Sequence, residues 1–198
     1  MITIKNIQTL DGQITHLQIP LTSERSLEAE GLLLPTLVDP HLSLGSPQRE
    51  KTPQHLSPTD PYQADFLWEA LNSGIIETIG SGYRVEERER ERLLWQGANF
   101  DFLNPIFLLP LLLTAYHEKK ITLENIVRLT KANLYDIFKL ERKEADFILV
   151  ALEQEHTVQR INQTQSNEIK LKGWPVYILI NDHLFQSPVG GYHLTRIE

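Results

Sequence analysis

The sequence predicts an α/β fold in which strands from the two chain ends build a β-sandwich and an α/β insert lies between them. Three observations lead to this class. Strand patterns fill the first part of the chain, helical apolar spacing fills the middle, and strand patterns return in the last third. The order β, then mixed α/β, then β therefore favours strands from both ends meeting in one unit.

The first twenty residues predict a β-hairpin. Ile2, Ile4 and Ile7 open the chain, and residues 14–19 alternate between apolar and polar side chains. Between them, Asp11-Gly12 is a strong hairpin-turn signal. We expect two antiparallel strands here.

A polar segment, residues 22–30, separates this hairpin from the apolar run 32–38, which reads as a strand buried on both faces. The following residues, 42–61, are rich in Ser, Pro, Gln and Gly without periodicity, which is typical of a loop.

The middle of the chain is predicted to be mostly helical. Thr59-Asp60-Pro61 is a helix start, an apolar stripe follows it, and Gly74 ends the helix. Residues 75–79 are short and β-branched, as in a buried strand. The Arg/Glu run 85–94 is typical of a solvated helix, and helical spacing covers residues 105–118, 122–131 and 132–140.

The last third predicts strands at residues 145–152 and 157–160. Residues 176–185 predict a hairpin that turns at Asn181-Asp182.

Composition limits the function classes. The chain has 198 residues and a net charge of −7, the wrong sign for a general nucleic-acid binder. It has no cysteine, which excludes disulfides and thiol nucleophiles. No export signal opens the sequence, and the most apolar stretch, residues 106–115, is about half the length of a membrane span. We expect a soluble cytoplasmic protein that binds neither nucleic acid nor membrane.

Several motifs, in order along the chain, resemble the dihydroorotases of the cyclic amidohydrolases, a superfamily of metal-dependent hydrolases. LLPTLVDPH (33–41) resembles the entry into the family's first barrel strand, and FLWEALNSGIIETIGS (66–81) resembles the approach to the last one. EADFILV (144–150) resembles the return into the family's β-sandwich, and residues 173–185 its closing hairpin. The resemblance implies a composite β-sandwich, residues 1–34 and 144–198, and a truncated (β/α)₈-barrel remnant, residues 35–143.

The barrel that the resemblance implies is incomplete. A full (β/α)₈ barrel needs about 250 residues, and about forty residues separate Val38 from Ile75, whereas each of six missing βα units needs roughly 30. We expect the two remaining barrel strands, residues 33–38 and 75–79, to pair in parallel. Their open edges would be covered in a homodimer with an apolar interface nearby.

The residues that the family uses for chemistry are largely replaced. Its first metal-ligand pair, His-x-His, here reads His41-Leu42-Ser43, and a hydroxyl is a poor substitute for an imidazole on zinc. Gly82 stands where the resemblance places the catalytic aspartate, and Gly45 where it places the arginine that binds the substrate carboxylate. We expect no catalytic residue, no cofactor and no bound metal, with His41 a remnant ligand.

A residual pocket is predicted around Asp39, His41, Ser43, Lys51 and Tyr83. Each has a plainer interpretation: Asp39 as a turn cap, His41 as a hydrogen-bonded residue at a strand end, and Lys51 as an exposed loop residue.

Three functions stay open. The first is a non-catalytic dihydroorotase-like protein retained for binding or assembly; the resemblance makes an aspartate transcarbamoylase-like enzyme one conceivable partner. The second is an active metal-dependent cyclic amidohydrolase that uses zinc with unconventional ligands, or whose site is completed across a dimer. The third is a small-molecule binding module that uses the residual pocket.

Overall fold

The protein is described by a computed structural model. It describes residues 2–19, 25–37, 61–81, 105–140, 146–162, 165–187 and 195–197, and every structural statement below refers to this part of the chain.

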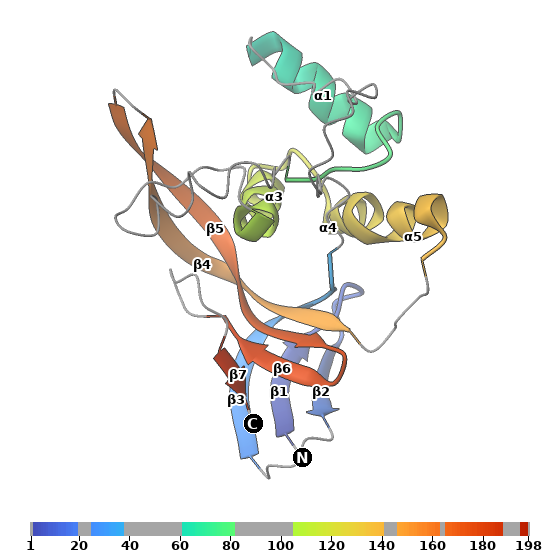
Figure 1. Ribbon diagram of the computed structural model, residues 1–198, viewed down its shortest axis with the longest axis vertical. Coiled ribbons are helices and arrows are strands. Elements are labelled where there is room, and N and C mark those ends of the chain that lie inside the picture. Colours follow the sequence, from blue (N-terminus) through green and yellow to red (C-terminus); the bar gives the residue numbers. More distant parts are fainter. Residues whose placement is uncertain are drawn as a thin grey trace, which may run out of the picture.

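Seven strands of the described chain form one sheet, in the order β2-β1-β3-β4-β5-β6-β7 (Figure 1). Strands from both chain ends lie in it, as the sequence predicts. The strands are β1 Ile2–Gln8, β2 Ile14–Ile19, β3 Arg25–Pro35, β4 Phe147–Asn162, β5 Gln165–Ile180, β6 His183–Gln186 and β7 Thr195–Ile197.

The predicted N-terminal hairpin is confirmed. β1 and β2 pair antiparallel, and Gly12 in the turn has a φ of 81°, which a glycine adopts without steric cost. A register shift between Ile4 and Ile7 marks a bulge in β1, and Asn6 there has a φ of 57°. The bulge lies on the strand that is paired on both sides.

β3 joins the two ends of the chain. It runs parallel to β1 from Arg25 to Leu32 and antiparallel to β4, where Leu32 faces Val150 and Leu34 faces Ile148. The strand predicted to start at residue 32 begins at Arg25, because the polar segment before it finds a partner in β1. A β-carbon on Gly31 would lie 2.5 Å from the Val150 carbonyl oxygen, so this close approach requires glycine.

β4 and β5 form one long hairpin. Strand structure is confirmed at both predicted stretches, residues 145–152 and 157–160, but the break between them is wrong, since they belong to the single strand β4 that begins at Phe147. A register shift between Ala151 and Glu155 is the irregularity that the sequence pattern suggested as a break. The predicted turn at Asn181-Asp182 is confirmed, with φ values of 48° and 61° that suit a two-residue turn.

The sheet curls upon itself. Ile7 of β1, Ile19 of β2 and Leu184 of β6 share one buried cluster with Leu149 and Leu179. In a flat sheet β2 and β6 would be five spacings apart, roughly 24 Å, too far for side chains to meet. The architecture is a mixed α/β fold with one curled, half-barrel-like sheet; the separate layers of the predicted sandwich are not confirmed.

The described helices follow the predicted boundaries closely, whereas the helix predicted at residues 85–94 lies outside the described residues. Gly74, at a φ of 84°, follows α1, and the Thr122 side chain accepts a hydrogen bond from the Asn125 N–H at 3.2 Å, which caps α4. No helix of the described part is long and apolar enough to cross a membrane. The helical elements are α1 Pro61–Ser73, η2 Pro105–Phe107, α3 Leu108–His117, α4 Leu123–Val127, the π-helical turn η3 Arg128–Ala132 and α5 Asn133–Phe138.

Residues 75–79 do not form the predicted strand, and their predicted parallel pairing with residues 33–38 is wrong. β3 lies between β1 and β4, while Ile75 is 77% exposed. The backbone of this stretch bonds to helices instead: the Ile76 N–H donates to the Ala70 carbonyl at 3.1 Å and the Ile79 N–H to the Leu129 carbonyl at 3.3 Å. The homodimer predicted from that pair stays a prediction.

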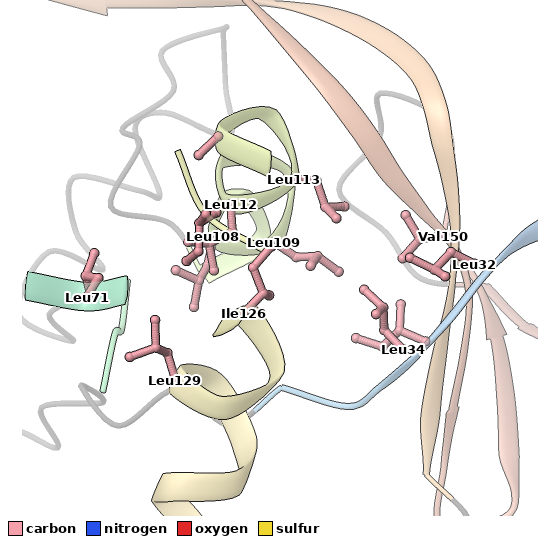
Figure 2. Close-up of a cluster of buried hydrophobic side chains, with 13 residues drawn as sticks. Leu32, Leu34, Leu71, Leu108, Leu109, Leu112, Leu113, Ile126, Leu129 and Val150 are labelled. Atoms are coloured by element: carbon pink, nitrogen blue, oxygen red, sulfur yellow. The ribbon is translucent and has the colours of Figure 1, made fainter. Parts of the chain in front are cut away.

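The helices cover one face of the sheet through a leucine-rich cluster. Figure 2 shows the leucines of α3 between Leu71 of α1 and the sheet residues Leu32, Leu34 and Val150. Alternate residues of the same strands, Leu33 and Leu149, face the cluster inside the curl. This part of β3 and β4 is therefore apolar on both faces, which explains the continuous apolar run in the sequence.

Candidate functional site

All five residues of the predicted pocket, Asp39, His41, Ser43, Lys51 and Tyr83, lie outside the described residues. The described chain stops at Leu37 before the first four and at Ser81 before Tyr83. Leu37 and Ile79 both pack against the leucine-rich cluster. The two stretches that lead to the predicted site therefore start from the same apolar core.

A hollow of about 430 Å³ lies where α1, residues 79–81, α3 and β5 meet. Its wall is mostly apolar, with Trp68, Leu111 and Ile169 contributed by three different elements. Ser81, Thr114, Glu118 and Lys170 add polar groups. Its volume falls in the range of small-molecule pockets, and its mixture of apolar wall and few polar groups is typical of them.

The α3 wall of this hollow is fixed against β5 at one point. The Lys172 N–H donates to Thr114 Oγ1 at 2.9 Å, and Thr114 Oγ1 donates to the Pro110 carbonyl at 2.7 Å. Next to this bond Gly173 has a φ of 93°, and a β-carbon there would lie 2.7 Å from Leu113 Cβ. Glycine at this position permits the helix to contact the strand backbone directly.

The opposite wall depends on hydrogen bonds from side chains to backbone. Arg128 Nη2 donates to the Leu71 carbonyl at the end of α1 at 2.6 Å, and Asn133 Nδ2 donates to the Glu77 carbonyl at 2.7 Å. Both donors lie in or beside η3, and the Leu129 carbonyl of this π-helical turn accepts from Ile79. Hydrogen bonds to η3 and Asn133 thus hold residues 75–79 in place. These residues lead to Ser81, which lines the hollow.

Charged groups lie beside the α3–β5 contact. Lys172 Nζ and a Glu153 carboxylate oxygen are 2.7 Å apart. The hydrogen bond from Lys172 lowers the pKa of Glu153, and the same bond raises the pKa of Lys172. His117 Nε2 lies 2.8 Å from the Leu152 carbonyl oxygen, so this nitrogen carries the proton that it donates. The histidine therefore holds the end of α3 to β4, whereas the carboxylate links β4 to β5.

Within the described residues, two buried side-chain atoms have no hydrogen-bond partner: His156 Nε2 and Trp174 Nε1. Their rings pack at a centroid distance of 4.7 Å, and Trp174 is 2% exposed. Burial lowers the pKa of His156, because the charged imidazolium loses hydration. Sequence spacing gave no signal for this pair, since the two residues meet only through the pairing of β4 with β5.

A second hollow, about 670 Å³, lies over β1, β3 and β4. Its lining includes Asn6, Gln8, Glu30 and Glu153 together with the apolar Ile14. Among the described residues no three His, Asp or Glu side chains are grouped so that they could hold a metal ion. No described residue is therefore assigned to a metal ion.

No protein-family model matches the sequence, and no curated protein matches it. Solved structures that are similar in fold include the following three. The inactive dihydroorotase-like domain of a Chaetomium thermophilum CAD-like multifunctional protein is 21% identical at a TM-score of 0.45, over 66% of this chain and 37% of that chain.

Dihydropyrimidinase from Brevibacillus agri NCHU1002 is 20% identical at a TM-score of 0.43, over 60% of this chain and 30% of that one. D-hydantoinase from Bacillus sp. AR9 is 17% identical at a TM-score of 0.39, over 61% of this chain and 30% of that one. This chain thus spans about a third of the length of these proteins.

These similar structures are a dihydroorotase-like domain, a dihydropyrimidinase and a hydantoinase, in agreement with the resemblance that the sequence motifs carry. Each identity is below 25% and each TM-score below 0.5. The similarity therefore brings no activity, substrate or partner to this chain.

Proposed function

We propose that this chain is a non-catalytic dihydroorotase-like protein that serves in binding or assembly. One observation carries the proposal: of the residues that the resemblance assigns to metal and substrate, His41 alone is present, with Ser43, Gly82 and Gly45 at the other matching positions. A catalytic zinc needs three protein ligands and an open position for water. One imidazole does not supply that set.

The described fold supports the same proposal. β3 and β4 pair directly. The described residues between them form helices, and residues 75–79 form no strand. In a (β/α)₈ barrel, active sites form where the carboxyl ends of eight parallel strands converge. Residues 75–79, the stretch that resembles the last of these strands, are held by η3 and α1 instead.

Metal content and hydrolysis test the proposal together. The protein would be purified after growth with added zinc and manganese, and its metal measured by mass spectrometry, beside hydrolysis of dihydroorotate and related cyclic amides. We expect substoichiometric metal and no turnover. Stoichiometric zinc or hydrolysis that His41→Ala abolishes would establish the alternative, an amidohydrolase with unconventional ligands or a site completed by a second copy.

As an assembly protein, the chain would act as a homodimer and could bind an aspartate transcarbamoylase-like enzyme. Binding to this enzyme is tested by size-exclusion chromatography. The chain is mixed with the aspartate transcarbamoylase of the same cell, and co-elution is measured. A complex that elutes at the summed mass supports it; separate elution at all concentrations contradicts it.

A second candidate function, small-molecule binding, is favoured by the apolar hollow of about 430 Å³. Ser81 in its lining is two residues from Tyr83 of the predicted pocket. Thermal shift with cyclic amides and pyrimidine intermediates would detect a ligand. Leu111→Trp, which fills the hollow, should abolish the shift, whereas Leu140→Trp, at an exposed position two residues after α5, should leave it unchanged.

A further inference from the structure

β2 is an edge strand of unusual composition for its position. β2 and β7 end the described sheet (Figure 1), so one side of β2 has no strand beside it in the described chain. Such an edge presents unpaired N–H and C=O groups that can pair with another strand. Soluble proteins commonly protect these edges with charged side chains, proline, bulges or short strands.

Most other open stretches of the described sheet have charged residues in their sequence or are very short, and β2 differs from them. β7 is three residues long and contains Arg196. The part of β3 without a partner on its β4 side contains Arg25, Glu28 and Glu30. The projecting halves of β4 and β5 alternate charges, among them Glu153, Glu155, Glu168, Lys170 and Lys172. β2 reads ITHLQI, without a carboxylate, lysine or arginine; Pro20 follows it in the sequence.

Exposure adds to this contrast. Ile14, at the start of β2, is 76% exposed, and Thr15, His16 and Gln18 are exposed as well. The bulge of this hairpin lies in β1, so β2 keeps an even edge. An uncharged, even edge with an exposed isoleucine gains backbone hydrogen bonds and apolar burial when another strand is added.

We propose that β2 pairs antiparallel with β2 of a second copy of this chain, which joins the two curled sheets into one. Antiparallel pairing of identical strands has two-fold symmetry, the commonest symmetry of protein dimers. Two chains of net charge −7 repel each other, so a contact between copies is favoured where neither brings a carboxylate. Asp11 precedes β2 in the chain. In the antiparallel pair, the two copies of Asp11 lie at opposite ends of the paired strands, so they do not repel each other strongly.

This proposal rests on the homodimer of the proposed function, but not on the absence of catalysis, and it places the interface elsewhere than near residues 33–38 and 75–79, where the sequence suggested it. That interface depends on the open edges of a strand pair that does not form, because residues 32–35 pair with β4 instead. The unpaired edge in this proposal is that of β2, near the start of the chain.

Light scattering with size-exclusion chromatography tests the pairing on the full chain. The unaltered protein should elute as a dimer. The double substitution Thr15→Lys and Gln18→Lys places four lysines along the paired strands, and it should shift the protein to monomer with at least a tenfold weaker association. Both positions are exposed, and circular dichroism should show an unchanged fold.

The matched control is Ala132→Lys with Ile137→Lys. It makes the same charge change on exposed helical positions and alters the exposed apolar Ile137 of α5, which is 48% exposed. This control should remain dimeric. A monomeric unaltered protein, a dimer that persists with lysines on β2, or a dimer lost in the helix control would each overturn the proposal.

Disulfide cross-linking tests the pairing independently, even if the lysine substitutions disturb folding. Because the chain contains no cysteine, single cysteines at positions 15 to 18 can form disulfides only between copies. Directly opposed residues of antiparallel strands have Cα atoms about 4.5–5.5 Å apart, within disulfide reach. Mild oxidation should yield a cross-linked dimer from the position nearest the two-fold axis and none from Ile137→Cys; no cross-link from any β2 position would contradict the pairing.

Discussion

The sheet and the helical layer are held together in different ways. In the sheet, backbone pairing joins the two chain ends, as where Leu34 faces Ile148. In the helical layer, local helices are connected by single side-chain donors, such as Arg128 to the Leu71 carbonyl and Asn72 Nδ2 to the Lys120 carbonyl at 2.7 Å. The sheet therefore depends on both ends being present, whereas the helical layer depends on individual side chains.

This difference predicts two kinds of failure. Loss of one strand from the sheet removes partners from strands at the other end of the chain, so the whole unit should melt together. Loss of one connecting side chain should loosen a helix and leave the sheet folded. The predictions below test this contrast, from the largest expected effect to the smallest.

Deleting the residues after Gly173 should unfold the N-terminal strands. The deletion removes Tyr177, Leu179 and Leu184 from the cluster that also buries Ile4 and Ile19, and an isolated hairpin is marginal in water. We expect the truncated chain to lack a cooperative thermal transition by circular dichroism. A cooperative melt of the truncated chain would show that the N-terminal strands fold independently.

Gly173→Ala should destabilise the contact between sheet and helices by about 2–4 kcal/mol, since it adds backbone strain to a close approach against Leu113. The matched control is Gly12→Ala. It has a similar φ of 81° with nothing within 4 Å of the added carbon, and strain alone should cost it about 1–2 kcal/mol. Urea unfolding of both variants measures the difference; equal losses would mean that the α3–β5 contact relaxes freely.

Arg128→Met should loosen α1 while the sheet stays intact. The substitution keeps the aliphatic part of the side chain and leaves the Leu71 carbonyl and Asn125 Oδ1 without their donor, at a cost of about 1–3 kcal/mol. Hydrogen exchange should accelerate in α1 and remain slow in β3 and β4.

The control for this change is Lys120→Met. It removes one cationic side chain from an exposed pair with Glu118, and such pairs contribute little to stability. Its exchange pattern should match that of the unaltered protein. Faster exchange in the sheet of Arg128→Met would contradict the separation of the two regions.

His156→Phe should reduce the loss of stability in mild acid. Burial lowers the folded-state pKa of His156 below its ordinary value of 6.5, so the unfolded chain binds the proton more tightly. Stability from this residue is complete above pH 6.5 and declines as the pH falls from there toward the folded pKa. The variant should lose less stability between pH 8 and pH 5 in urea titrations; an equal loss would assign the acid sensitivity to other groups.

The local features of this protein are determined by its sequence alone. Asp11-Gly12 and Asn181-Asp182 form the predicted turns, Gly74 follows α1, and Thr122 caps α4. Each depends on the preference of one or two residues for a backbone conformation or a nearby N–H group. Such preferences act within a few residues and do not require the rest of the fold.

Tertiary structure decided the features that need a distant partner. The polar residues 25–30 became strand because β1 lies beside them, whereas the β-branched residues 75–79 did not, because β3 already has partners and η3 supplies theirs. His156 and Trp174 meet only when β4 pairs with β5. The pocket predicted around Asp39, His41, Ser43, Lys51 and Tyr83 stays a prediction.

The physical reason for this division is that a strand forms hydrogen bonds with a neighbouring strand, and the local sequence does not indicate which segment that neighbour is. A turn or a cap is satisfied by its own neighbours. The sequence by itself therefore determined where the chain turns and where its helices begin and end, and the tertiary structure decided which extended segments became strands and which apolar side chains they brought together.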